Sequence, residues 1–137
     1  MDIRHISDVY AVSPQIAPKD CAAIADAGFT CIICNRPDAE IPASHHASPM
    51  ADAARQAGLA FHALPLTHQT MTPENIEQHK ALIEAANGPV LAYCASGTRS
   101  TIVWALGQAG QTPANEILSA AASAGYDLAG LRGALGS

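Results

Sequence analysis

The sequence has few charged and few aromatic side chains, and it has no cluster of basic residues. Only 14% of its 137 residues are charged and 4% are aromatic, so a folded core must consist mainly of Ala, Ile, Leu and Val. The formal net charge is −5 at pH 7, and Lys and Arg are too scattered to displace counterions from phosphates. These absences argue against a nucleic-acid partner and favour a protein that acts on small molecules or on other proteins.

The sequence also lacks any run of eighteen or more apolar residues, and its N-terminus has no basic and apolar segments of the kind found in signal peptides. We therefore expect no membrane partner and a cytoplasmic location. In that compartment the four cysteines are expected to be reduced thiols; they are Cys21, Cys31, Cys34 and Cys94.

Short apolar runs alternate with Ala-rich helical stretches along the chain. The patterns predict strands within residues 3–12, 29–35, 59–66 and 89–94, and helices over 18–28, 49–58, 72–88, 98–107 and 113–124. This alternation is typical of βαβ units, so we expect a single α/β domain over residues 1–137, with a central, mostly parallel sheet flanked by helices. The tail, residues 123–137, is expected to pack on the sheet or to mediate dimerisation.

The stretch Cys-Ala-Ser-Gly-Thr-Arg-Ser, residues 94–100, joins the last predicted strand to a helix. Ligands bind beyond the carboxyl ends of strands in such sheets, and Cys94 stands at one of these ends. The loop contains no proline, and a glycine can turn its N–H groups inward to form an anion-binding nest. The residues predicted to bind the anion in this loop are Ala95, Ser96, Gly97, Thr98 and Ser100.

Two further features favour the thiolate form of Cys94. The positive end of the following helix points at the loop, and Arg99 adds a permanent charge on its first turn. We therefore predict that Cys94 is a nucleophile, with a hydroxyl of Ser100 or Thr101 donating to the sulfur or to a bound oxyanion. The alternative is a buried, inert cysteine before an ordinary glycine turn.

Several motifs resemble those of known families. Four residues separate Cys94 from Arg99, which resembles the loop of rhodanese-type sulfurtransferases, whereas tyrosine and dual-specificity phosphatases have five. With SPQIAP at 13–18, CNRPDAE at 34–40 and LAYCASGTRST at 91–101, the chain resembles over nearly its full length the phosphatase-like domain of bacterial β-lactamase-hydrolase-like proteins. That domain occurs alone or fused to persulfide dioxygenases. The resemblance implies a cysteine-phosphatase (dual-specificity phosphatase-like) fold, catalytic roles for Cys94 and Arg99, and a persulfide dioxygenase as a partner.

The resemblance leaves the reaction open, because the family is described both as phosphatases and as sulfur transferases. A phosphatase needs a general acid, which in the cysteine phosphatases is an aspartate about thirty residues before the cysteine. The corresponding stretch here, residues 64–75, has no aspartate; Glu74 is explained by the helix that begins there, and His68 is the candidate acid. Thiolate attack on a persulfide or thiosulfate needs little or no general acid catalysis, because a thiolate or sulfite can leave without a proton.

Three hypotheses follow. The leading one is a sulfurtransferase that carries a sulfane sulfur as a persulfide on Cys94, with a small-molecule persulfide or thiosulfate as its donor. The second is a phosphatase that hydrolyses phosphate esters through a phosphocysteine. The third is a non-catalytic module that only binds oxyanions at this loop.

The remaining candidates have weaker signals. Arg36 and Asp38 follow a predicted strand. They are expected to bind the substrate anion or to brace the loop, and the alternative is that they form a surface turn nucleated by Pro37. Cys31 and Cys34 point to opposite faces of one strand, so we predict no metal site there, and no cofactor is implied. Cys34 is interpreted as a core residue or a thiol that resolves oxidised Cys94. His79, beside Lys80, is expected on a solvated helix face.

Overall fold

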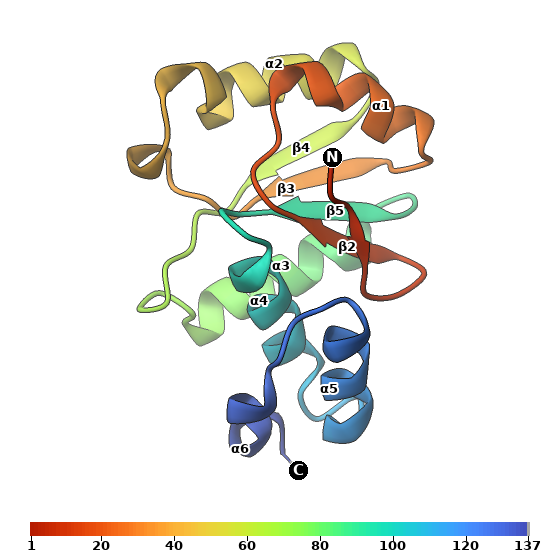
Figure 1. Cartoon of the computed structure of the whole chain (residues 1–137), viewed down its shortest axis with the longest axis vertical. Helices are drawn as coiled ribbons and strands as arrows, with labels where there is room; N and C mark the ends of the chain where they lie inside the picture. Colours follow the sequence, from red (N-terminus) through yellow and green to blue (C-terminus); the bar gives the residue numbers. More distant parts are fainter. Residues whose placement is uncertain (137) are drawn as a thin grey trace.

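The computed structural model describes residues 1–136 and contains a five-stranded sheet with helices on both faces (Figure 1). The first strand, β1 (Arg4–His5), pairs antiparallel with β2. All other neighbouring strands are parallel, which confirms the predicted α/β class and the mostly parallel sheet. Across the sheet the order after β1 is β2 (Tyr10–Ser13), β5 (Val90–Tyr93), β3 (Cys31–Cys34) and β4 (Ala60–Ala63).

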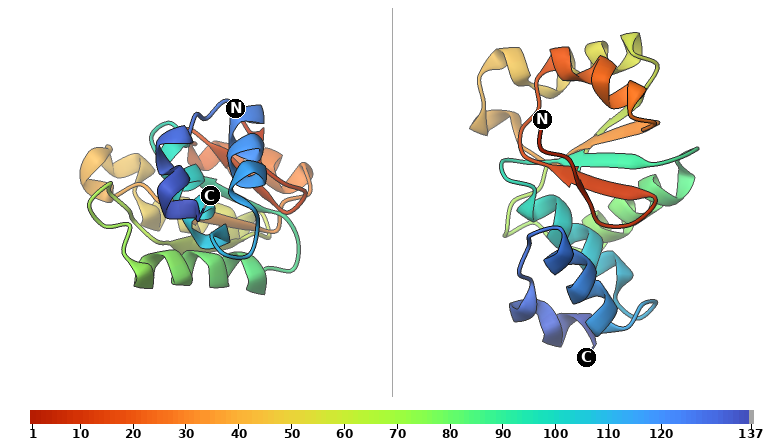
Figure 2. Two further views of the ribbon diagram at one scale, coloured as in Figure 1. Left: turned by 90° about the horizontal axis from the view of Figure 1, so that it is seen from below. Right: turned by 45° about the vertical axis from the view of Figure 1, so that its right-hand side comes forward.

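The helices form layers on the two faces of the sheet. The helices α1 (Cys21–Asp26) and α2 (Ala47–Gln56) lie on one face, and α3 (Pro73–Ala85) and α4 (Thr98–Gln108) lie on the other (Figure 1). The helices α5 (Ala114–Ser123) and α6 (Arg132–Leu135) pack against α4, farther from the sheet (Figure 2). Short 3-10 turns complete the chain at Pro18–Asp20, Asp38–Glu40, Ala43–His45 and Ala129–Leu131.

The central strands are buried on both faces, as their continuous apolar sequences predict. Alternate side chains enter two separate cores. Ile33 of β3 packs in the core that contains Trp104 of α4, whereas Ile32 packs in the core that contains Ile24 of α1 and Met50 of α2. Each face of the sheet is therefore fixed by its own layer of helices.

Most predicted element boundaries lie within two or three residues of those in the structure. The helix α2 begins at Ala47, two residues earlier than predicted, and the carboxylate of Asp38 accepts a hydrogen bond from the Ala47 N–H at 2.9 Å. The helix α3 begins after Thr72, as predicted, but it ends at Ala85 because Ala86 is already extended, and Gly88 does not cap it. The tail packs against α4 and α5, and its α6 lies away from the sheet (Figure 2).

The register of the parallel strands places three strand ends side by side. Tyr93 at the end of β5 pairs with Ser13 on one side and with Cys34 on the other. The residues that follow, Cys94 and Asn35, therefore lie at one edge of the sheet. This edge carries the candidate site.

A buried polar cluster lies beneath that edge and includes His79, which is completely buried. The expectation of a solvated His79 was wrong. Its Nε2 lies 3.0 Å from the Tyr10 hydroxyl, and its Nδ1 lies 3.4 Å from the Asn35 amide nitrogen. The face of α3 that carries His79 packs toward the sheet, where these two side chains supply the polar partners that a buried imidazole needs.

The hydrogen bonds of the cluster assign the protonation state of the imidazole. The Tyr10 hydroxyl donates its one proton to the Ser100 carbonyl at 2.7 Å, so the His79 Nε2–H must be the donor to Tyr10. Asn35 then donates one N–H to His79 Nδ1 and the other to the Leu64 carbonyl. Burial lowers the pKa of His79 from 6.5 to about 4, so the ring is neutral near pH 7.

No helix within residues 1–136 is both long enough and apolar enough to cross a membrane.

Acid should destabilise the fold through His79. Between pH 6.5 and 4 the unfolded chain binds a proton at this imidazole before the folded chain does, so lowering the pH through this window removes about 3 kcal/mol of stability. In His79→Gln this part of the pH dependence should disappear, as measured by urea unfolding at pH 7 and pH 4.5. The exposed His62, changed to Gln, is the control and should keep the pH dependence of the wild type. An unchanged pH dependence in His79→Gln would contradict the buried neutral imidazole.

Candidate active site

The loop at residues 94–99 follows β5 directly and begins α4. Cys94 is 1% exposed, and the Gly97 N–H donates a hydrogen bond to its Sγ at 3.1 Å. Gly97 has a φ of +92°, in the left-handed region, where a glycine is strongly preferred. This conformation turns the Gly97 N–H toward the sulfur, in the manner predicted for an anion nest.

The side chain of Arg99 is held by a carboxylate that the sequence analysis did not single out. Glu40 accepts two hydrogen bonds from the guanidinium, each 2.8 Å long, and the Leu66 carbonyl accepts a third, also at 2.8 Å. Hydrogen bonds from Arg99 hold the pKa of Glu40 below its usual range. Glu40 is therefore ionised near pH 7, and it fixes one edge of the guanidinium.

A cleft of about 440 Å³ opens in front of this arrangement. Glu40 and His68 are the two proton-transfer candidates that line it, and the exposed His68 reaches it from the loop after β4. Cys94 is buried and does not line the cleft, although neighbouring residues of its loop do. The residues that line the cleft are Glu40, Thr67, His68, Gln69, Ala95, Ser96, Thr98 and Arg99.

Arg36 and Asp38 occupy bracing positions. Arg36 donates from Nε to Glu40 at 3.1 Å and from an Nη atom to Gln15 at 3.3 Å, and it does not line the cleft. Asp38 holds the first turn of α2. The contacts favour bracing over anion binding or a plain surface turn: Arg36 positions Glu40, which in turn positions Arg99.

The hydroxyls expected to face the sulfur or the anion have other partners. Ser100 is completely buried and donates to Asn35 Oδ1 at 2.8 Å, and Thr101 donates to the Gly97 carbonyl at 2.7 Å. Asn35, which directly follows β3, thereby ties this strand to α4. Ser100 therefore contributes to the site indirectly, because its hydrogen bond to Asn35 fixes the first turn of α4.

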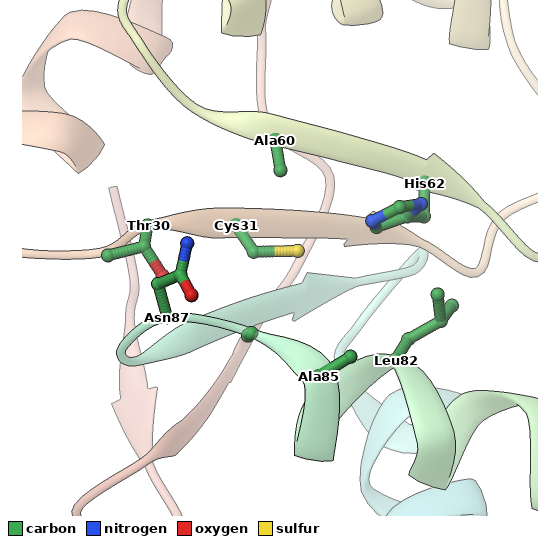
Figure 3. Close-up of a pocket in the computed structure, with 8 residues that line it drawn as sticks. Thr30, Cys31, Ala60, His62, Leu82, Ala85 and Asn87 are labelled. Carbon is green, nitrogen blue, oxygen red and sulfur yellow. The ribbon is translucent and has the colours of Figure 1, made fainter.

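Neither Cys31 nor Cys34 lines the cleft, and the two pack in different cores. Cys31 lines a separate cavity of about 190 Å³ at the amino end of β3, between the strands and α3 (Figure 3). Burial raises the pKa of Cys31 to about 11 and also raises the pKa of Cys34, so both stay protonated thiols. Within residues 1–136, no three His, Cys, Asp or Glu side chains are grouped so that they could hold a metal ion.

The ion pair between Glu40 and Arg99 should be measurable as a coupling free energy. Arg99 is almost buried, so removal of Glu40 leaves a charge without its partner, and a double-mutant cycle with E40Q and R99M should give a coupling of about 1–2 kcal/mol in urea unfolding. The exposed pair of Asp52 and Arg55 is the control, and its cycle should give less than about 0.5 kcal/mol. Equal couplings in the two cycles would contradict a structural role for Glu40.

Comparisons with known proteins agree with this architecture. Residues 2–111 match the family described as the phosphatase-like domain of beta-lactamase hydrolase-like proteins. The beta-lactamase hydrolase-like protein of Xylella fastidiosa (strain Temecula1) is 32% identical over 130 residues, which are 93% of this chain and 30% of that protein. The chain thus spans less than a third of the length of this curated relative.

Solved structures show the same fold. A "putative phosphatase" of Neisseria meningitidis is 35% identical, with a TM-score of 0.87 over 99% of this chain and 97% of that chain. P. aeruginosa TpbA in complex with pTyr is 18% identical, with a TM-score of 0.59 over 98% of this chain and 90% of that chain, and this likeness concerns the fold alone. The chain belongs to the phosphatase-like domain family of β-lactamase-hydrolase-like proteins, and it has a cysteine-phosphatase fold.

Proposed function

We propose that the protein is a cysteine-dependent sulfurtransferase that carries a sulfane sulfur as a persulfide on Cys94. The observation that carries this proposal is that the carboxyl group of Glu40 is ionised and bound to Arg99. Among the residues that the structure describes, it is the one carboxyl group that lines the cleft, and both of its oxygens accept hydrogen bonds from Arg99. An ionised carboxylate in this position has no proton to give to a leaving group, so a reaction that releases a stable anion fits the site best.

The transfer conserves atoms and electrons. The Cys94 thiolate attacks the outer sulfur of thiosulfate, a new S–S bond forms, and the S–S bond of the donor breaks as sulfite leaves with the electron pair. A second thiolate, for example that of a small thiol, then attacks the outer sulfur of the Cys94 persulfide and restores the Cys94 thiolate. A persulfide dioxygenase, implied by the family resemblance, is the partner that we expect to use the small-thiol persulfide formed in this way.

The residues of the site have distinct roles in this reaction. Arg99 has five N–H donors and gives three to Glu40 and Leu66, which leaves its Nε–H and one Nη2–H for the sulfonate group of the donor. The backbone N–H groups of the loop donate hydrogen bonds to the other oxygens of the anion, as in other nests. The Gly97 N–H stabilises the sulfur itself.

A second candidate, hydrolysis of phosphate esters, is favoured by the position of His68. This side chain lines the same cleft as Arg99, where a protonated imidazole would reach the leaving-group oxygen of an ester. The names of two structural relatives support the same candidate: one is described as a phosphatase, and another was solved with pTyr. Cys94 would then form a phosphocysteine, and water would release phosphate from it.

Brief exposure to thiosulfate or glutathione persulfide should add one sulfur atom to the reduced protein, as measured by intact mass. The Cys94→Ser variant should gain none, because the accepting thiolate is absent, and sulfite or cyanide should discharge the sulfur from the wild type. The Cys34→Ala variant is the matched control and should gain sulfur like the wild type, because the Cys34 thiol is buried and protonated. If the wild type gains no sulfur although Cys94 still reacts with an alkylating reagent, sulfur transfer is excluded.

If the site hydrolyses phosphate esters, His68→Gln should lower kcat on an aryl phosphate by about a hundredfold, since general acid catalysis contributes at least this much. Glu74→Gln is the control, because Glu74 is exposed at the start of α3 and does not line the cleft. Equal turnover by His68→Gln and the wild type would show that His68 is not the acid.

A further inference from the structure

One peptide unit of the catalytic loop is hydrogen-bonded at both ends. Its N–H, on Gly97, donates to Cys94 Sγ at 3.1 Å. Its carbonyl, on Ser96, accepts a hydrogen bond from the Tyr126 hydroxyl at 2.9 Å. A chain of two hydrogen bonds therefore runs from the phenol through the peptide to the nucleophile.

The backbone of Tyr126 is held in a well-defined position after α5. Gly125 has a φ of +99°, its N–H donates to the Ala122 carbonyl, and the Tyr126 N–H donates to the Ala121 carbonyl, both at 2.9 Å. These two bonds form a Schellman motif, which ends the helix and fixes the direction of the following residue.

The side chain of Tyr126 is also fixed by neighbouring residues. Arg4 donates a hydrogen bond to the Ala124 carbonyl at 3.1 Å, and its guanidinium lies 5.4 Å from the centre of the Tyr126 ring. Tyr126 is 8% exposed, and a side chain at Gly97 would collide with the Tyr126 hydroxyl. Burial raises the pKa of Tyr126, so the hydroxyl keeps the proton that it donates.

We propose that Tyr126 is a positioning residue of the active site, whose hydroxyl orients and polarises the Ser96–Gly97 peptide so that it stabilises the Cys94 thiolate. A carbonyl that accepts a hydrogen bond makes the N–H of the same peptide a stronger donor, because the two bonds polarise one another. The bond also keeps the Ser96 carbonyl turned away from the nest, where its negative end would repel a bound anion.

Tyr126 lies outside the residues that match the family model. The family match ends at residue 111, and Tyr126 lies fifteen residues beyond it. The role does not rest on the proposed function, because a stabilised thiolate serves sulfur transfer and phosphate hydrolysis alike. A test on the thiol itself therefore separates this inference from the choice of reaction.

The test compares Tyr126→Phe with Tyr93→Phe. Tyr126→Phe removes the hydroxyl and its hydrogen bond but keeps the ring. The hydroxyl of the buried Tyr93 makes no hydrogen bond to residues 94–99 within the part of the chain that the structure describes, so Tyr93→Phe is the matched control. Alkylation of Cys94 is followed at pH 7 with the anion iodoacetate and with the neutral iodoacetamide, and the modified cysteine is identified by peptide mass mapping. The ultraviolet absorbance of the thiolate is recorded for each variant against the same variant with Cys94→Ser.

In Tyr126→Phe we expect alkylation by iodoacetate to slow by about three- to tenfold, the effect of losing one hydrogen bond, and the preference for iodoacetate over iodoacetamide to fall. The thiolate absorbance at pH 7 should also fall. Tyr93→Phe should match the wild type in all three measurements. Wild-type rates and absorbance in Tyr126→Phe, with or without a lower melting temperature, would overturn the proposal.

A further variant, Tyr126→Leu, removes both the hydroxyl and the ring. If the hydroxyl acts as proposed, the iodoacetate rate of Tyr126→Leu should be reduced at least as much as that of Tyr126→Phe. Slow alkylation in Tyr126→Leu together with wild-type rates in Tyr126→Phe would assign the effect to ring packing and overturn the role of the hydroxyl.

Discussion

The site depends on the pairing of one almost buried cation. Arg99 must lie at the start of α4, beside Cys94, if it is to attract an anion, and there it is largely removed from water. Such a charge is stable only with a partner, which Glu40 provides through two hydrogen bonds. This pairing also fixes the loop after β3 against the cleft. The same interaction that holds the arginine in place thus shapes the cleft and removes the one nearby carboxyl group from proton transfer.

The loop at residues 94–99 is supported by a buried cluster of hydrogen-bonded polar side chains, here called the polar base, whereas its outer edge is exposed. Asn35 joins three elements, because it bonds the Leu64 carbonyl after β4, His79 of α3 and Ser100 of α4. Each hydrogen-bonding group of this amide has a partner, which is what makes such a cluster stable in a core. Ala95 and Ser96 above it are exposed. The polar base therefore sets the position of the loop, while the outer edge stays open to substrate.

The sequence allowed prediction of those features that local patterns determine. The alternation of strands and helices, the position of Cys94 at a strand end and the glycine of the nest all follow from short stretches of chain. For Glu40, the sequence reveals only that it lies four residues after Arg36. Its ion pair with Arg99 could not be predicted, because the packing of loops distant in the sequence brings the two side chains together. His79 looks solvated beside Lys80, because its partners Tyr10 and Asn35 are brought to it only by the fold. Tyr126 likewise reaches Ser96 from thirty residues away.

Some hydrogen-bond donors of the site are engaged by protein acceptors and others remain for a ligand, and this determines which leaving groups the site can assist. The Gly97 N–H is engaged by the sulfur of Cys94, and three donors of Arg99 are engaged by protein acceptors. The remaining donors can hold a small oxyanion close to the thiolate, but they cannot protonate a leaving group, because backbone amides and guanidinium groups keep their protons. A leaving group that is already a stable anion needs no such proton, whereas any other leaving group needs an added acid, for which His68 in the same cleft is the candidate.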